Sequence, residues 1–192
     1  MHKQALTGYE RAMELGSVSR LSTVNNVATL HYSQGRPAEA EATYERAIAG
    51  YKKVLGSEHK LTLGAINNLG TLYFDLGRLG EAETMLKQAL IGKENALGPE
   101  HLSTLSTVYN LGNLYSDQGR LAEAEAAYER ALAGYQKAVG PEHELTLKVA
   151  KDLQIFYRDQ GRLAEAEAID ERLLNGKGKA SGPINPTRHD ES

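Results

Sequence analysis

Two kinds of helical segment alternate along the chain. Residues 104–118 carry apolar side chains at the three- and four-residue intervals of one helix face. These positions are Val108, Leu111, Leu114 and Tyr115. Gly119 follows and is predicted to end this helix. Residues 121–139 are rich in Ala, Glu, Leu and Arg, which favour helix, and Gly140 with Pro141 ends this second run. The pattern predicts a helix–turn–helix unit.

This unit recurs every 42 residues without insertions. Gly-Arg pairs stand at 35–36, 77–78, 119–120 and 161–162, and Glu-Ala-Glu triplets stand at 39–41, 81–83, 123–125 and 165–167. A phosphate-binding loop or a catalytic pair is normally used once per domain, whereas fourfold recurrence at fixed spacing indicates stacked repeats. The sequence therefore predicts an all-α array of nine helices, in which one unpaired helix precedes four antiparallel pairs.

The repeated residues resemble the tetratricopeptide repeat (TPR), in the 42-residue form found in kinesin light chains and in fungal NLR-like (nucleotide-binding, TPR-containing) proteins. The resemblance covers about residues 5–183 and includes the loop LGPEH at 97–101. It rests on small residues in the first helix, an aromatic residue one turn later and alanines in the second helix: Ala28, Gly70, Gly112; Tyr73, Tyr115, Tyr157; Ala40, Ala82, Ala124, Ala166. The resemblance implies a right-handed superhelix, an α-solenoid of stacked helix pairs.

The 42-residue register also predicts the boundaries of the repeats. An orphan second helix and loop occupy 1–20, four repeats occupy 21–62, 63–104, 105–146 and 147–183, and a disordered tail occupies 184–192. The fourth repeat departs from the pattern at Gln154, Asp170 and Leu173, as expected of a C-terminal cap. The N-terminal end is expected to be truncated, which leaves self-association through this uncapped end open.

Composition narrows the classes of partner. The formal net charge of −3 gives no general attraction to nucleic acid or to acidic membranes. The chain has no cysteine, and no stretch approaches the 18 apolar residues of a membrane span. We expect a cytoplasmic protein that binds neither nucleic acid nor membrane.

Two candidate catalytic or metal-binding features have simpler interpretations. Loop histidines recur one repeat apart, about 10 Å or more given helix diameters, so they cannot share a metal ion. They are His59, His101 and His143, and each is expected to bond the backbone of its own turn. The GKGK at 176–179 lacks the glycine of a phosphate loop, which is replaced by Glu171. We expect no enzyme, no cofactor and no metal.

Two further repeated features are interpreted structurally. Arg36 and Glu39, with their copies in later repeats, predict local ion pairs exposed to solvent. Glycines inside the second helices each cost about 1 kcal/mol relative to alanine, so we expect a neighbouring helix to approach them closely. They are Gly8, Gly50, Gly92, Gly134 and Gly176.

The resemblance places a peptide-binding groove on the first helices. The predicted groove residues are Asn25, Asn26, Thr29, Tyr32, Asn67, Asn68, Thr71, Phe74, Tyr109, Asn110, Asn113, Lys148, Lys151 and Arg158. Asparagine is a mediocre helix former, and its amide can grip the backbone of an extended peptide. Alternatively, these asparagines bond to the neighbouring repeat. The lysines and the arginine near the C-terminal end would favour an acidic segment.

Two functions follow from these observations. The first is a non-enzymatic scaffold that binds a protein or an extended peptide in the groove of the array. The alternative is a regulatory or self-assembly repeat domain cut from a larger NLR-like signalling protein.

Overall fold

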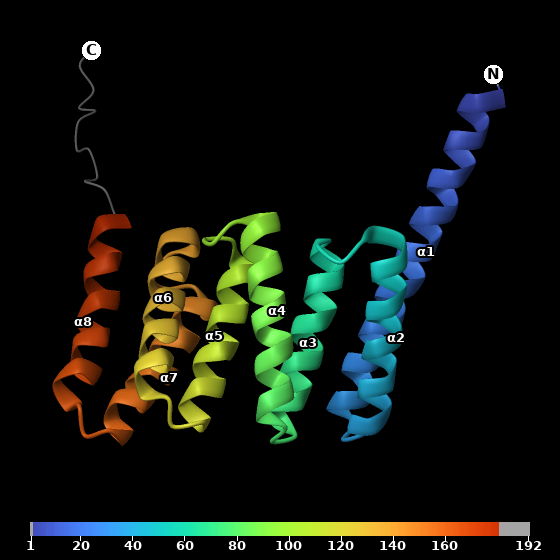
Figure 1. Cartoon of the computed structure of the whole chain (residues 1–192). Helices are drawn as coiled ribbons and strands as arrows, with labels where there is room; N and C mark the ends of the chain where they lie inside the picture. The colour runs from blue at the N-terminus through green and yellow to red at the C-terminus, as the bar shows by residue number, and fades with distance from the viewer. Residues whose placement is uncertain (1, 181–192) are drawn as a thin grey trace, which may run out of the picture.

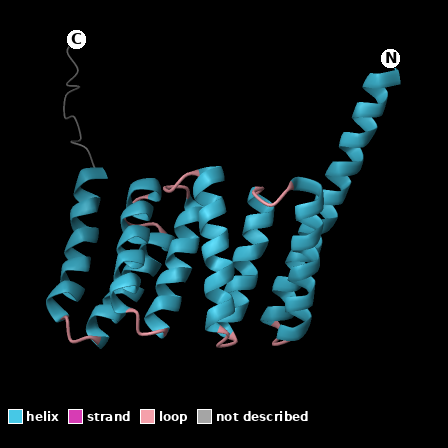
Figure 2. Ribbon diagram, viewed as in Figure 1, coloured by secondary structure: helices cyan, strands magenta, loops and turns pink. Residues whose placement is uncertain are grey.

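Eight α-helices, joined by short loops, form the described part of the chain and stand in one row from α1 to α8 (Figure 1). The structure, a computed structural model, describes the backbone of residues 2–180 and the side chains of residues 17–173. The helices are α1 His2–Ser33, α2 Pro37–Leu55, α3 Lys60–Asp75, α4 Leu79–Leu97, α5 Leu102–Asp117, α6 Leu121–Val139, α7 Glu144–Asp159 and α8 Leu163–Ala180. Figure 2 shows helices and loops throughout this part of the chain, and no strand.

The helices pack as antiparallel pairs that stack in sequence order. The first helix of each unit (α1, α3, α5 and α7) packs against the second helix that follows it (α2, α4, α6 and α8). Each of α2, α4 and α6 then packs against the first helix of the next unit. The predicted all-α solenoid of helix pairs is confirmed.

The structure corrects the expectation of a separate helix and loop within residues 1–20. α1 is one helix of 32 residues, whose N-terminal part extends beyond the end of α2 (Figure 1). In the 42-residue register, Glu14 occupies the position of Gly56, which ends α2 with φ +91°. Residues other than glycine rarely adopt this conformation, so Glu14 does not supply the stop. Ser17 likewise replaces His59, the N-cap of α3. The described part of the chain has eight helices, not nine, and the expected tail at 184–192 lies outside it.

The loop histidines cap the first helices. Nδ1 of each ring accepts a hydrogen bond from the backbone N–H two residues on, at 3.2 Å for His59, 3.1 Å for His101 and 3.2 Å for His143. A buried threonine three residues after each histidine donates to the carbonyl of the glycine that follows the preceding helix, at 2.7–2.9 Å. The prediction that each histidine bonds its own turn is confirmed.

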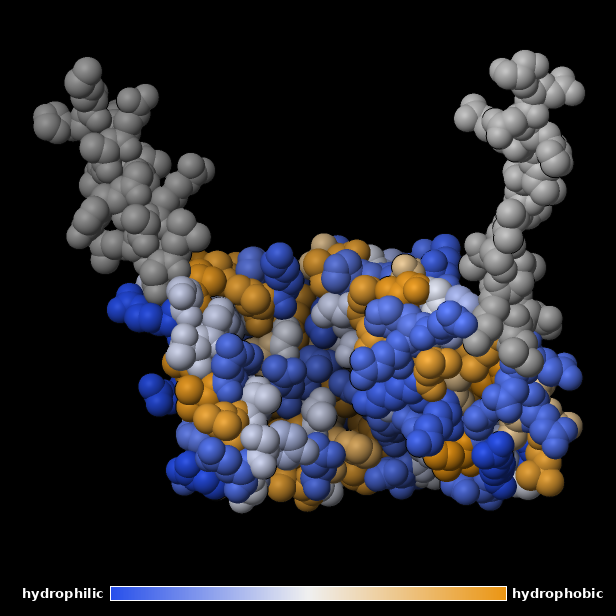
Figure 3. Space-filling model, turned by 180° about the vertical axis from the view of Figure 1, so that it is seen from behind, coloured by the Kyte–Doolittle hydropathy of each residue, from blue (hydrophilic) through white to orange (hydrophobic). Residues whose placement is uncertain are grey.

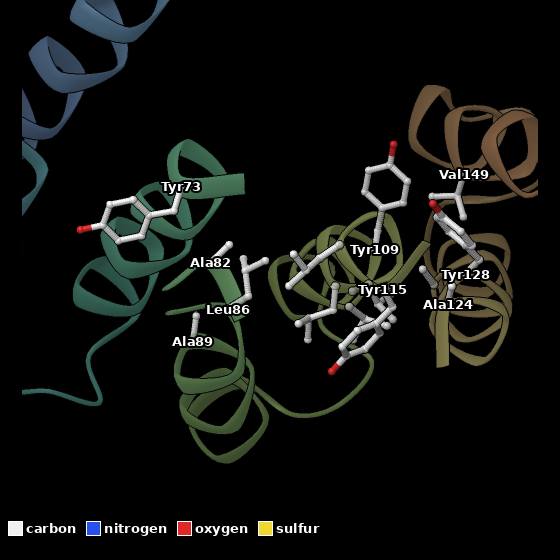
Figure 4. Packing of buried hydrophobic residues seen from close by; sticks show 14 of the residues in the cluster. Tyr73, Ala82, Leu86, Ala89, Tyr109, Tyr115, Ala124, Tyr128 and Val149 are labelled. Carbon is white, nitrogen blue, oxygen red and sulfur yellow. The ribbon is translucent and has the colours of Figure 1, made fainter. Parts of the chain in front are cut away.

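Small residues let the paired helices approach closely. The second-helix alanines Ala40, Ala82, Ala124 and Ala166 are at most 1% exposed. A Cβ atom added to Gly50, Gly92 or Gly134 would lie 2.2–2.5 Å from a leucine of the paired first helix, which confirms the predicted close approach. Gly8 and Gly176 lie outside the described side chains. Figure 4 shows part of the buried layer around α4, α5 and α6.

Arginines at the start of the second helices join consecutive repeats. Each forms the predicted pair with the glutamate three residues on, and this glutamate is half exposed. Three of them also bind the second glutamate of the preceding triplet: Arg78 to Glu41 at 2.8 Å, Arg120 to Glu83 at 2.8 Å and Arg162 to Glu125 at 2.6 Å. Their guanidinium groups lie 4.2–4.5 Å from the ring centroids of Tyr73, Tyr115 and Tyr157. The sequence interpretation captured the local pair but missed the bond between repeats.

Candidate functional site

Side chains from α3, α4, α5 and α7 line a pocket of about 210 Å³, called here the central pocket. It brings together six of the predicted groove residues: Thr71, Phe74, Tyr109, Asn110, Asn113 and Lys148. Asp75 and Leu86 complete its lining. The pocket thus combines residues from three repeats.

Seen from behind in Figure 3, the surface of the molecule carries polar and apolar residues intermixed, without one continuous apolar patch.

Aromatic and charged groups give the central pocket its character. The Tyr109 ring is buried, and its hydroxyl donates to the carboxylate of Asp152 in α7. Burial and this hydrogen bond raise the pKa of Tyr109 to about 12. Lys148 Nζ lies 5.1 Å from the centroid of the same ring. An aromatic ring with an ammonium group beside it can bind a peptide in which an apolar or aromatic side chain stands next to an acidic one.

Two of the predicted asparagines bond across repeats. The Asn67 side-chain oxygen accepts from Thr107 Oγ1 at 2.8 Å and from Asn110 Nδ2 at 3.5 Å. Asn110 Nδ2 also lies 3.3 Å from Thr71 Oγ1. At Asn67 and Asn110 the alternative interpretation, in which the asparagines bond to the neighbouring repeat, therefore describes the contacts. Asn68 is half-buried and makes no hydrogen bond to the described side chains.

Asn25, Asn67 and Asn68 line a second pocket, of about 280 Å³, between α1, α3 and α5. Its lining includes Lys93 from α4, so we call it the lysine pocket. Lys93 is 2% exposed, and its Nζ donates to the Ser103 carbonyl at 3.1 Å and to Thr107 Oγ1 at 2.8 Å. Burial lowers the pKa of Lys93 to about 8.

Sequence reasoning missed Lys93, although the repeat register carries a signal for it. The same position holds Tyr51 one repeat earlier and Tyr135 one repeat later, so a cation interrupts a column of buried aromatic residues. A departure from the repeat at a buried position was the signal that could have singled it out.

The remaining predicted residues lie outside these two pockets. Asn26, Thr29 and Tyr32 are exposed on α1, and Thr29 Oγ1 is 2.9 Å from the Tyr44 hydroxyl. Tyr32 donates to the carboxylate of Asp75, and this bond is the main cause that raises the pKa of Tyr32 to about 12. Tyr32 therefore ties α1 to α3.

Lys151 and Arg158 are exposed on α7, at the end of the array that was expected to be basic. A third pocket at this end, of about 190 Å³, is lined by Asn113, Ser116, Tyr128, Asp152, Ile155, Phe156 and Asp159. Its lining contains two carboxylates and no cation. The lining of this pocket is thus acidic, and the exposed Lys151 and Arg158 are not part of it.

The described residues do not contain three or more His, Cys, Asp or Glu side chains grouped to hold a metal ion. Within the same residues, none of the helices is long and apolar enough to cross a membrane. What the pockets offer is amide, hydroxyl, ammonium, carboxylate and aromatic groups, which bind by hydrogen bonding, charge and apolar contact.

Comparison with known proteins identifies the repeat. The family model described as tetratricopeptide repeat matches residues 19–95, 63–137 and 103–178. A search of the curated proteins gave no match.

Solved structures with the same architecture include kinesin-light-chain-like proteins. A putative kinesin light chain from Podosopora anserina with nearly identical TPR-like repeats is 27% identical, with a TM-score of 0.74 over 88% of this chain and 80% of that one. A substituted form of the same protein gives 27% identity and a TM-score of 0.73 over the same shares. BtubC (BKLC) from P. vanneervenii, at 24% identity and a TM-score of 0.72 over 90% of this chain and 68% of that one, shares the fold.

Proposed function

Because the chain belongs to the tetratricopeptide repeat family, we propose that it is a non-enzymatic scaffold that binds an extended segment of a partner protein across α1, α3, α5 and α7. The observation that carries this proposal is the central pocket, where predicted groove residues from three repeats line one cavity. A cytoplasmic location is part of the proposal, because a chain without cysteine needs no oxidising compartment to fold.

The groups of the central pocket suggest how a peptide would be held. Phe74, Leu86 and Tyr109 offer apolar surface to one side chain of the peptide. Asn113 and Thr71 offer polar atoms beside it, which suit the peptide backbone. Lys148 favours an acidic residue next in the segment, and Lys151 and Arg158 would extend this preference toward the C-terminal end. Asp152 and Asp159 limit how far it extends.

Peptides selected on the wild-type protein from a random library test the proposal, with Asn68→Ala and Lys148→Ala as variants. Asn68 has no hydrogen bond to the described side chains and Lys148 is exposed, so both variants should fold normally. Loss of one neutral hydrogen bond at Asn68 should weaken binding by about 2- to 13-fold. Loss of Lys148 should weaken binding of acidic peptides, and less so at high salt.

Lys137→Ala is the matched control, because Lys137 lies on α6 and pairs with Glu100 away from both pockets. Calorimetric titration gives the affinities, and circular dichroism checks folding. Equal affinity of the selected peptides for the wild type and for both groove variants would overturn the proposal.

A second candidate function, self-association, is favoured by apolar residues on α1. Val27 is 37% and Leu30 52% exposed, whereas their counterparts one repeat later, Leu69 and Leu72, are at most 4% exposed. We propose that a second copy of the chain covers this face of α1, as it would in a self-assembly domain of a larger NLR-like protein. Light scattering would show a concentration-dependent dimer that Leu30→Glu abolishes, and a monomer at all concentrations would exclude it.

A further inference from the structure

Lys93 is a cation at a buried position that a neutral tyrosine occupies in the neighbouring repeats. In the preceding repeat the Tyr51 hydroxyl donates to Ser22 Oγ at 3.0 Å. In the repeat of Lys93, Gly64 replaces that serine, so the polar partner is missing too. Lys93 instead reaches α5, where it bonds Ser103 and Thr107. Lysine in place of tyrosine at this position therefore directs a buried polar group toward the lysine pocket.

No anion compensates this buried charge within the described part of the chain. Both acceptors of Lys93 Nζ, the Ser103 carbonyl and the Thr107 hydroxyl, are neutral. The other charged residue of the pocket lining is Lys60, also a cation. Glu58 lies 3.1 Å from the Cβ position of Gly92 and does not line the pocket. A buried ammonium group without an anionic partner is costly, so an anion that enters this pocket gains a strong interaction.

Another polar group of the same pocket has no hydrogen-bond partner among the described residues. The side-chain oxygen Oδ1 of Asn25 is buried and accepts no hydrogen bond from the described residues. The equivalent oxygen of Asn67 accepts from Thr107, but one repeat earlier Ala65 occupies the threonine position. The lysine pocket therefore presents a cation in need of an anion and an acceptor in need of an N–H or O–H donor.

We propose that the lysine pocket takes an acidic side chain of the bound peptide, with its carboxylate on Lys93 and a neighbouring peptide N–H on Asn25. This inference rests on the proposed function and names one residue class that the groove selects. A peptide segment with Asp or Glu is the simplest ligand that carries both groups. A glutamine in its place offers the donor but not the anion.

Binding of a carboxylate should be coupled to a proton. A nearby carboxylate favours the charged form of Lys93, so the bound protein keeps a proton that the free protein loses near pH 8. The affinity for an acidic peptide should therefore fall by up to about tenfold per pH unit above pH 8. The matched glutamine peptide should lack this dependence.

The test compares two synthetic peptides, Ac-Ser-Ala-Glu-Ala-Ser-NH2 and the same peptide with Gln in place of Glu. Protein labelled with ¹³C at lysine reports the titration of Lys93 by NMR, and calorimetry gives affinity and proton uptake. The Glu peptide should raise the titration midpoint of Lys93 by at least one pH unit, and the Gln peptide should not. Lys93→Met should bind the Glu peptide at least tenfold more weakly, with the Gln peptide unaffected.

Lys137→Met is the control for the loss of one positive charge, because Lys137 lies on α6 and pairs with Glu100 away from both pockets. It should leave the Lys93 titration and its response to the Glu peptide unchanged. If both peptides bind equally and Lys93 titrates as in the free protein, the inference is wrong while the peptide groove stands. If neither peptide binds but acetate shifts the Lys93 titration, the pocket takes small anions only, and both the inference and the peptide groove fall.

Discussion

Arg120, at the start of α6, binds the carboxylate of Glu83 in the preceding repeat at 2.8 Å. The same guanidinium group pairs with Glu123 and lies 4.2 Å from the ring centroid of Tyr115. Lys87 adds a second cation to Glu83 at 2.6 Å. The bonds from Arg120 and Lys87 lower the pKa of Glu83 to about 2. A surface arginine thus links two repeats through one partly buried carboxylate.

Glu83→Gln should therefore destabilise the array by about 1 kcal/mol at pH 7, because the link between repeats loses its charge. The pKa of Glu83 is lower in the folded chain than in the unfolded one. Its stabilisation is then fully present above about pH 4.5 and is lost as the pH falls toward 2. Urea unfolding at pH 7 and at pH 3 should show the difference between wild type and variant shrinking in acid.

Glu123→Gln is the matched control, because Glu123 is half exposed and bonds only within its own repeat. Its effect at pH 7 should be smaller than that of Glu83→Gln. Equal effects of the two substitutions would show that the bond between repeats contributes nothing beyond the local pair.

The fold was predictable from the sequence because it follows from repetition. Helix-ending glycines and buried alanines recur at fixed spacing, and each copy supports the others. The link between Arg120 and Glu83 was harder to foresee, since it depends on how one repeat stacks on the next. The continuous α1 was missed because the absence of a stop at Glu14 carries less signal than its presence at Gly56.

The candidate site was predictable as a surface but not as a set of contacts. The resemblance placed Tyr109, Asn110 and Lys148 on one face, and the structure joins them in one pocket. It could not show that Asn110 bonds Asn67, because that depends on side-chain geometry across repeats. Lys93 was missed because the prediction was built on residues that recur, whereas this position holds a tyrosine in the neighbouring repeats and a lysine here.

Gly92 and Gly64 form a pair of helical glycines that should respond oppositely to alanine. A Cβ at Gly92 would lie 2.4 Å from Leu63 Cδ2, in a close-packed layer, whereas a Cβ at Gly64 meets nothing within 4 Å. Gly92→Ala should destabilise the protein by about 1–2 kcal/mol through overpacking. Gly64→Ala should stabilise it by about 0.5–1 kcal/mol through helix propensity. Chemical denaturation measures both, and a more stable Gly92→Ala variant would contradict the close approach.

Ala65 offers a way to satisfy the unpartnered oxygen of Asn25. Ala65→Thr should place a hydroxyl where Thr107 stands one repeat later, within reach of Asn25. Ala65→Val has nearly the same shape without the hydroxyl, so the comparison isolates the hydrogen bond. The threonine variant should be more stable than the valine variant by about 1 kcal/mol. Equal stabilities in urea unfolding would show that the Asn25 oxygen is not short of a donor.

Lys93→Met should stabilise the free protein at neutral pH, although it removes two hydrogen bonds. Methionine keeps the length of the side chain and removes a charge that burial disfavours. The lowered pKa of about 8, against an ordinary value near 10.5, corresponds to a cost of up to about 3 kcal/mol for the charged form. The lost bonds to Ser103 and Thr107 offset part of this, so we expect a gain of about 1–2 kcal/mol at pH 7.

The pH dependence of this gain distinguishes charge from packing. Between about pH 8 and pH 10.5 the unfolded chain binds more protons at Lys93 than the folded chain does, so wild-type stability rises with pH relative to the variant. The advantage of Lys93→Met should therefore be constant below pH 8 and shrink as the pH rises to 10.5. Differences taken against the variant cancel the tyrosines that titrate at higher pH. Urea unfolding of both proteins at half-unit steps from pH 6.5 to 10.5 measures the difference in their free energies of unfolding. A difference that does not change with pH would show that burial does not disfavour the charged form of Lys93.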